Sequence, residues 1–234
     1  MTAPEPVLLR FAGPFGVEVE LRQSAGLLAM VFLLMALLQG GSLPVALGLV
    51  AVLMGSVLLH EAGHVWGARV QGIAVPRVVL HGGGGFTETG PAAPDQQGLI
   101  VAMGPIVNLA IWALCGLAVS GFADNALGNP ALARLGFALL PWLSFAGFVN
   151  LAFFVFNMVP VQPLDGGRLL LLALGRRLPQ ARALRLAGGV GVVFSLLWWP
   201  ALVFVFATTG WLILFAPSLA LHLAMARGQV APKG

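Results

Sequence analysis

The sequence predicts an all-α polytopic membrane protein with about six transmembrane helices, and its composition carries that prediction. Hydrophobic residues make up 59% of the 234-residue chain and charged residues only 9%, whereas soluble domains carry about 25% charged residues. So few charges cannot cover the surface of a soluble fold, and a chain this apolar would not remain disordered. The long apolar runs also lack the alternation typical of membrane β-barrels.

Charge and cysteine content argue against a nucleic-acid-binding protein and against a scaffold held by disulfides. The net charge is +4, but no basic run accompanies it, so we assign the basic residues to membrane topology and expect no nucleic-acid partner. The single cysteine, Cys115, lies in an apolar run and excludes an intrachain disulfide.

Short β-strands are predicted near the N-terminus and after the second helix. Apolar and polar residues alternate over 15–22, which indicates an amphipathic strand within the N-terminal region 1–23. We expect this strand to lie on the membrane surface. A break rich in glycine and proline follows the second helix at 72–97, and its segment 75–80 is a second candidate for extended structure.

Apolar runs predict the transmembrane core, 24–226. The six expected spans are Ser24–Leu38, Pro44–Val70, Gly98–Ser120, Arg134–Met158, 184–207 and 211–226. A short amphipathic piece, Arg168–Leu178, separates the fourth span from the fifth, and the tail 228–234 is expected to be disordered. Because the chain has no long linker and no internal repeat, we interpret 1–234 as a single domain.

The basic residues orient this arrangement. Six spans place both termini on one side, and eleven of the twelve basic residues fall on that side, with Arg134 alone on the other. The positive-inside rule makes the richer side cytoplasmic. We therefore expect a multi-pass protein of the plasma membrane with both termini toward the cytoplasm.

The second predicted span contains three polar residues that the bilayer disfavours, His60, Glu61 and His64. Residues four apart project from the same side of a helix, so the two imidazoles can bind one zinc ion. Glu61 lies beside them, where it can take a proton from an attacking water. A chance occurrence of this motif would also have to place all three polar residues inside an apolar span, which favours a metal site.

A catalytic zinc needs a third protein ligand, and Asp165 is the candidate. It follows the cytoplasmic end of the fourth predicted span, at a depth that matches His64 in its own helix. The alternative role is an N-cap for the helix that follows, which is common for aspartate. Depth and composition favour ligation, although both roles could hold.

Together these motifs resemble the site-2 protease family of intramembrane zinc metalloproteases. The resemblance rests on HExxH at 60–64 in one helix and NxxPxxPLDGG at 157–167 in a later one, with GPxxN at 104–108 between them. These motifs cover about residues 55–168. The resemblance implies that 1–234 forms an intramembrane metalloprotease domain.

The same resemblance implies roles for single residues. His60, His64 and Asp165 would hold one Zn²⁺ per chain, and Glu61 would be the general base and acid. Asn157 would bind substrate or stabilise the oxyanion, unless it is a helix-end amide bonded to free carbonyls.

An asparagine, a glycine-rich segment and two further histidines remain to be interpreted. Asn108 is expected to anchor a helix near the site. The glycine-rich segment resembles family strands that lie beside the substrate, with a flexible connector as the alternative, and its substrate-binding candidates are Gly83, Gly84, Gly85 and Phe86. We place His81 and His222 outside the zinc shell.

The function predicted from these residues is intramembrane zinc endopeptidase activity, with the active site toward the cytoplasm. By family analogy, the substrates are single-span membrane proteins such as tethered transcription factors or anti-sigma factors, cut within or near their membrane segment. The lipid bilayer is the other partner, and control would come from a regulatory membrane partner. The alternatives are an ion-coupled transporter, which predicts repeated halves, and a catalytically inactive relative that only binds membrane helices.

Overall fold

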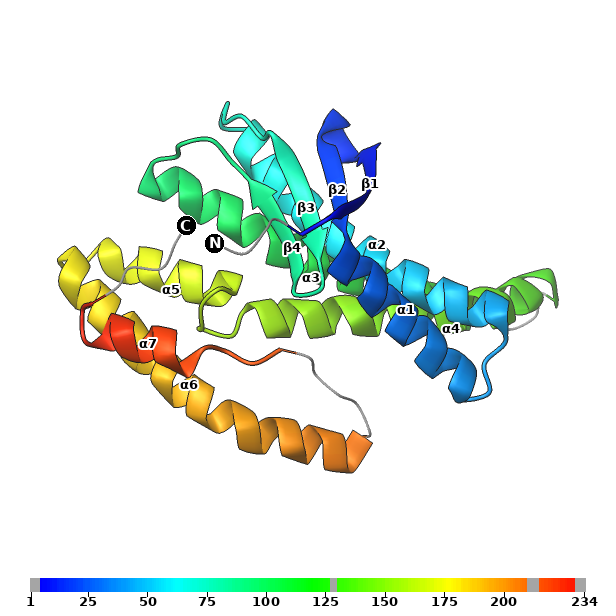
Figure 1. The fold of residues 1–234 in the computed structure, drawn as a ribbon. Coiled ribbons are helices and arrows are strands. Elements are labelled where there is room, and N and C mark those ends of the chain that lie inside the picture. Colours follow the sequence, from blue (N-terminus) through cyan, green and yellow to red (C-terminus); the bar gives the residue numbers. More distant parts are fainter. Residues whose placement is uncertain (1–4, 127–129, 210–214, 230–234) are drawn as a thin grey trace. The chain divides into compact units, whose positions relative to one another are not determined.

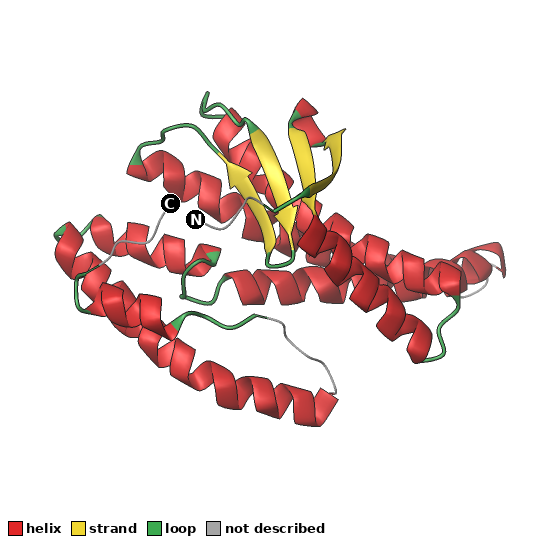
Figure 2. Cartoon of the chain, viewed as in Figure 1, coloured by secondary structure: helices red, strands yellow, loops and turns green. Residues whose placement is uncertain are grey.

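A computed structural model describes residues 5–126, 130–209 and 215–229. The chain divides into two compact units, Met1–Phe154 and Val155–Gly234. Within the described residues the structure contains seven α-helices and one small sheet (Figures 1 and 2). The predicted fold class, a helical membrane protein with a few strands, is therefore confirmed.

The first unit carries a four-stranded sheet in the order β1-β2-β3-β4, drawn as yellow arrows in Figure 2. The strands are β1 (Val7–Ala12), β2 (Glu18–Arg22), β3 (Arg77–His81) and β4 (Gly84–Glu88). The pairs β1–β2 and β3–β4 are antiparallel hairpins, and β2 pairs with β3 in parallel. Because β4 lies last in this order, one of its edges has no strand beside it among the residues that the structure describes.

The N-terminal strand differs from the prediction for 15–22. Regular pairing begins only at Glu18, and 14–16 form a 3₁₀ turn in which Phe15 has φ 60°. The predicted polar side of the strand is not exposed at Glu20, which is 1% exposed and forms ion pairs with Arg10, Arg22 and Arg77. The 3₁₀ turn delays the start of the strand, and ion pairs with arginines of three strands allow Glu20 to be buried. Periodicity within one segment could not show either feature.

Four helices are long and apolar enough to cross a membrane, by length and composition, among the residues that the structure describes. They are α2 (Leu43–Arg69), α3 (Pro94–Ala126), α4 (Pro130–Asn157) and α6 (Gln180–Thr209). The first predicted span corresponds to α1 (Gln23–Leu38), which is apolar but has 16 residues. The predicted spans are all helical in their described parts except the last.

The last predicted span, 211–226, lies partly outside the described residues. Its described part is helical only in α7 (Leu219–Ala226), which has 8 residues. At about 1.5 Å per residue this helix is too short to cross a bilayer. A crossing by the whole of 211–226 therefore remains a prediction.

Close helix packing and a small apolar core shape the first unit around α2. Gly63 and Gly67 face α3 so tightly that a Cβ at Gly63 would lie 2.5 Å from the carbonyl oxygen of Met103. Small residues four apart allow membrane helices to approach closely in this way. The last turns of α2 also pack against the sheet in one buried cluster that includes Val65, Ala68, Val19 and Val78. As a result, α3 and the sheet both lie against the segment that carries the HExxH motif.

The second unit consists of the end of α4, the loop 158–164, α5 (Asp165–Gly175), α6 and α7. Helices α6 and α7 pack closely because α6 has glycine where they meet. A Cβ at Gly188 would lie 2.3 Å from the backbone nitrogen of Ala226. Near the other end of the pair, Trp198, Phe156 and Phe215 form an edge-to-face aromatic cluster.

Candidate metal centre

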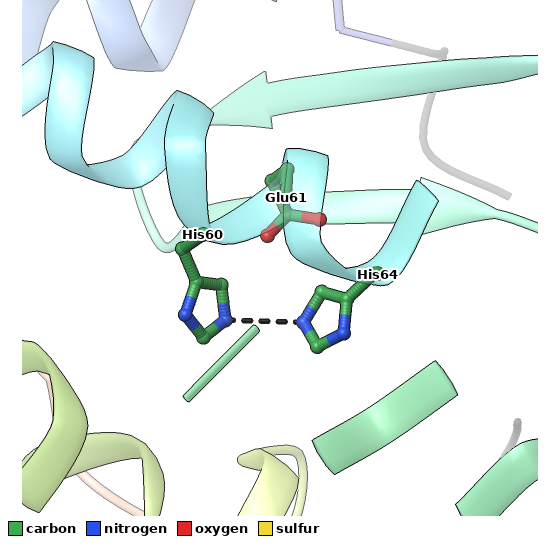
Figure 3. Close-up of side chains that lie close together, drawn as sticks. All are labelled: His60, Glu61 and His64. Atoms are coloured by element: carbon green, nitrogen blue, oxygen red, sulfur yellow. Dashed lines mark hydrogen bonds between the residues drawn. The ribbon is translucent and has the colours of Figure 1, made fainter. Parts of the chain in front are cut away.

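Helix α2 brings His60, Glu61 and His64 together, as the spacing predicted. One possible ligand atom from each of the three side chains lies within 4.8 Å of the others. All three are buried, with relative exposures of 6%, 3% and 8%. Figure 3 shows the two imidazole rings turned toward each other below the helix, with Glu61 beside them. The ring planes are nearly perpendicular, at 87°.

The Nδ1 atom of each imidazole is hydrogen-bonded to an oxygen. His64 Nδ1 lies 2.8 Å from the backbone carbonyl oxygen of Ile100, and His60 Nδ1 lies 2.6 Å from Asn108 Oδ1. A carbonyl can only accept, so His64 carries its proton on Nδ1. The same conclusion for His60 depends on which way the Asn108 amide faces.

A chain of buried amides settles the orientation of Asn108. Asn150 Nδ2 donates to the carbonyl oxygen of Ala146 at 2.9 Å and to Ser56 Oγ at 3.0 Å, which identifies the other end of that amide as its oxygen. Asn108 Nδ2 then donates to Asn150 Oδ1 at 2.7 Å. Asn108 Oδ1 therefore faces His60 and accepts its Nδ1 proton. Asn108 does join α3 to α4, as expected of an anchor, and it also orients His60.

This protonation pattern suits a metal ion. With both Nδ1 atoms protonated, each neutral ring has its lone pair on Nε2, and the two Nε2 atoms are 3.1 Å apart, the contact drawn in Figure 3. Two lone pairs at this distance repel unless a cation lies between them. Two nitrogens bound to one tetrahedral zinc are about 3.3 Å apart, given Zn–N distances of about 2.0–2.1 Å. A metal-bound histidine usually donates its other ring N–H to an oxygen acceptor, as the Nδ1 atoms of His60 and His64 do here.

Gly104 of α3 forms the wall behind the two rings. A Cβ there would lie 2.5 Å from His64 Nε2 and 2.8 Å from His60 Cε1. Only glycine allows the α3 backbone to approach the imidazoles this closely. The first glycine of the GPxxN motif thus leaves room for the histidines, and the asparagine of that motif orients one of them.

Strand β4 covers Glu61. Thr87 donates its hydroxyl proton to Glu61 Oε2 at 2.7 Å, and a Cβ at Gly85 would lie 2.3 Å from Glu61 Oε1. The predicted glycine-rich segment is therefore ordered at this point: Gly84, Gly85 and Phe86 belong to β4 and Gly83 to the turn before it. The flexible-connector alternative is wrong for 84–86. Substrate binding by these residues stays a prediction.

Asp165 and Asn157 belong to the second unit, so their proposed roles stay predictions. Asp165 is buried and is the first residue of α5, with Leu164 at the N-cap position. The alternative N-cap role therefore becomes that of a carboxylate in the first helical turn, which the helix dipole also favours. Asn157 is the last residue of α4. A Cβ at Gly166 would lie 2.3 Å from the carbonyl oxygen of Met158, so the glycine after Asp165 allows the loop to fold back.

Sequence reasoning missed the residues that support this centre. Asn150, Ser56 and Thr87 carry no spacing signal, because each acts through a contact with a distant segment. The one available signal was the presence of amides and hydroxyls inside otherwise apolar spans. Among the other histidines, His81 lies on β3, where its Nδ1 accepts from the backbone N–H of Gly83, and His222 lies in the second unit.

Comparisons with known proteins agree with this class of site. Residues 130–198 match the profile of Peptidase family M50, and that stretch contains Asn157 and Asp165. A zinc metalloprotease of Methanocaldococcus jannaschii, MJ0392, is 29% identical over 147 residues, or 62% of this chain and 40% of the relative. Stage IV sporulation protein FB of Bacillus subtilis is 29% identical over 148 residues, or 60% of this chain and 45% of the relative. The chain thus spans less than half the length of these curated relatives.

One solved structure shares the fold. The site-2 protease from Methanocaldococcus jannaschii aligns over 97% of both chains with a TM-score of 0.60 and 21% sequence identity. In fold, in sequence and in its histidine pair, the chain is therefore similar to zinc metalloproteases. The predicted resemblance to the site-2 protease family of zinc metalloproteases is confirmed by these matches.

Proposed function

We propose that this chain is an intramembrane zinc endopeptidase that hydrolyses peptide bonds within or near the membrane segment of single-span proteins. The observation that carries the proposal is the pair of Nε2 lone pairs 3.1 Å apart, with the Glu61 carboxylate beside them. A transporter would need neither this tautomer arrangement nor a carboxylate next to the pair. The four long apolar helices and the site-2 protease fold support a location in the bilayer.

In this proposal His60 and His64 hold one zinc ion and Asp165 completes the protein ligands. When bound, zinc supplies Lewis-acid polarisation of the scissile carbonyl and makes the attacking water easier to deprotonate. Glu61 takes one proton from that water as its oxygen bonds to the carbonyl carbon. Glu61 then gives the proton to the leaving amine as the C–N bond breaks. Asn157 donates to the carbonyl oxygen while that oxygen is negative.

Strand β4 offers a way to hold the substrate extended. No described strand lies beside its outer edge, and its Gly85 and Thr87 touch the catalytic carboxylate. An extended peptide pairing with this edge would have its carbonyls near Glu61. A helical substrate hides its carbonyls in internal hydrogen bonds, so segments with helix-weakening residues should be cut faster. Phe86, which is 42% exposed, would contact the substrate side chains.

By family analogy the substrates are membrane-tethered transcription factors or anti-sigma factors. A regulatory membrane partner would control their cleavage. We assign the protein to the plasma membrane. The distribution of basic residues supports an orientation with the site toward the cytoplasm, because eleven of twelve fall on one side of the proposed spans.

The decisive experiment compares wild type with Glu61→Gln in liposomes. Both proteins should bind one zinc per chain, because Glu61 is not a proposed ligand. Cleavage of a panel of single-span substrates should fall about 10²–10⁴-fold in the variant, the usual contribution of a general base. Glu18→Gln, at an exposed position of β2, is the matched control and should cleave like wild type. Equal cleavage by wild type and Glu61→Gln, or a wild type that binds no zinc, would show that the proposal is wrong.

A second experiment tests pairing with β4. Substrate peptides that carry a backbone N-methyl group near the cut site lack one strand-pairing donor. They should lose affinity relative to unmethylated peptides with the same side chains, whereas equal affinity would contradict the edge-pairing role.

A further inference from the structure

His222 is a buried histidine of the second unit whose role the zinc chemistry leaves open. It belongs to α7 and is 1% exposed. Its Nδ1 lies 2.8 Å from the carbonyl oxygen of Ser218, with Ser195 Oγ also nearby at 3.3 Å. A carbonyl only accepts, so the ring proton is on Nδ1 and the lone pair is on Nε2.

That lone pair accepts a hydrogen bond from the loop that leads to Asp165. The backbone N–H of Gln162 donates to His222 Nε2 at 3.0 Å, across 60 residues of sequence. Gln162 is itself buried, so this N–H could not bond to water instead. The loop continues with a turn in which Leu164 N–H donates to the carbonyl oxygen of Val161, and α5 then begins at Asp165.

The ring has space only because α6 has a glycine opposite it. A Cβ at Gly191 would lie 1.9 Å from His222 Cδ2, which is far inside any real contact. Gly189, on the same helix, has no atom within 4 Å of its Cβ position. Helix α6 is therefore shaped around the imidazole at one position, and this is a specific fit rather than a general preference for small residues.

We propose that His222 is a positioning residue, which fixes the loop that presents Asp165 as a metal ligand. This inference rests on the proposed function, because it requires Asp165 to bind zinc. His222 bridges the start of α7 to the Gln162 backbone, with one nitrogen donating and the other accepting. Asp165 lies three residues beyond the bridge, so a loose Gln162 leaves the carboxylate less well placed before zinc arrives. The ordering of the loop must then be achieved on binding, which weakens zinc affinity.

Two substitutions separate this role from general packing. His222→Asn keeps a donor that can reach Ser218, but it is too short to accept from Gln162. His222→Gln is longer and can place its side-chain oxygen near the position of Nε2. Zinc affinity, measured in detergent by competition with a fluorescent chelator, should weaken about 10–100-fold in His222→Asn, as for other residues that orient metal ligands. It should stay close to wild type in His222→Gln.

A glycine pair provides the test if the histidine variants fold poorly. Gly191→Ala should displace the ring and weaken zinc binding, whereas Gly189→Ala should bind zinc like wild type. Hydrogen exchange of the 158–165 segment in the metal-free protein should be faster in His222→Asn and Gly191→Ala only. The inference is wrong if zinc affinity in these two variants matches wild type, or if His222→Gln is as weak as His222→Asn.

Asp165→Ala distinguishes failure of this inference from failure of the proposed function. If Asp165→Ala loses zinc while His222→Asn and Gly191→Ala retain it, the ligand assignment stands and only the role of His222 is overturned. If Asp165→Ala binds zinc like wild type, Asp165 is not a ligand and the proposed site itself is wrong.

Discussion

The two units hold their candidate ligands in different ways. In the first unit, His60 and His64 project from a continuous helix, and each ring is oriented by an oxygen of the neighbouring helix α3. In the second unit, Asp165 follows a loop that has little regular structure, and a single imidazole from α7 holds the loop backbone. The histidines are therefore positioned by helix geometry and then refined by hydrogen bonds, whereas the aspartate depends on the loop itself.

Because of this difference, different kinds of substitution should disrupt the candidate ligands of the two units. A helix keeps the spacing of two side chains even when one of their partners is lost, so damage to the histidine pair should require steric intrusion or loss of an orienting bond. A loop has many alternative conformations, and the loss of one buried hydrogen bond allows several residues to move. The following predictions test that contrast.

The largest effect is expected from Gly104→Ala. Its methyl group would overlap both imidazoles, and overpacking of this kind destabilises by about 1–3 kcal/mol even when neighbours can shift. Here the neighbours are the proposed ligands themselves, so zinc affinity should fall about 100-fold, the upper end for substitutions outside the ligand set. Competition with a fluorescent chelator measures the zinc affinity. Gly116→Ala, on the same helix with open space at its Cβ, is the control, and equal affinities in the two variants would contradict the prediction.

An intermediate effect is expected from Asn108→Ala. The His60 Nδ1 proton would lose its acceptor, and zinc affinity should weaken about 10–100-fold. Asn150→Ala removes the next amide in the chain and should weaken affinity less, because Asn108 can still accept from His60. If Asn150→Ala had the larger effect, packing between α3 and α4 rather than orientation of His60 would explain these amides.

Thr87→Val should separate chemistry from metal binding in the first unit. Loss of the hydroxyl removes a hydrogen bond to the Glu61 carboxylate, and bonds to charged groups contribute about 1.5–3 kcal/mol. We expect kcat to fall about tenfold or more while zinc affinity is retained. Thr87→Ser keeps the hydroxyl and should restore most of the activity, and a similar loss in both variants would speak against the hydrogen bond.

The smallest effect is expected at the N-terminal end of the first unit, far from metal ligation. Hydrogen bonds from Ser24 at the start of α1 lower the pKa of Glu5 below its ordinary value of 4.5. A carboxyl whose pKa is lowered by folding contributes stability above its unfolded pKa, and that stability is lost as the pH falls through the folded pKa. Wild type should therefore melt slightly above Glu5→Gln at neutral pH, and the two should converge in acid. A difference that grew with acidity would contradict this.

Much of the centre was predictable because it depends on local spacing. Composition alone predicts a membrane protein, and the interval between His60 and His64 predicts their shared helix face. The burial of Glu20 could not be predicted in the same way. It depends on ion pairs with arginines of three strands, and no periodicity within 15–22 indicates those partners.

The amino-acid sequence was therefore sufficient for the membrane class, the four long apolar helices and the shared helix face of His60 and His64, because helix periodicity and hydropathy act over a few turns of chain. Tertiary structure alone decided which nitrogen of each histidine carries the proton and that β4 covers Glu61. It also decided that His222 holds the Asp165 loop. These contacts join segments from 26 to 60 residues apart, and their geometry depends on helix packing that glycines such as Gly104 and Gly191 allow.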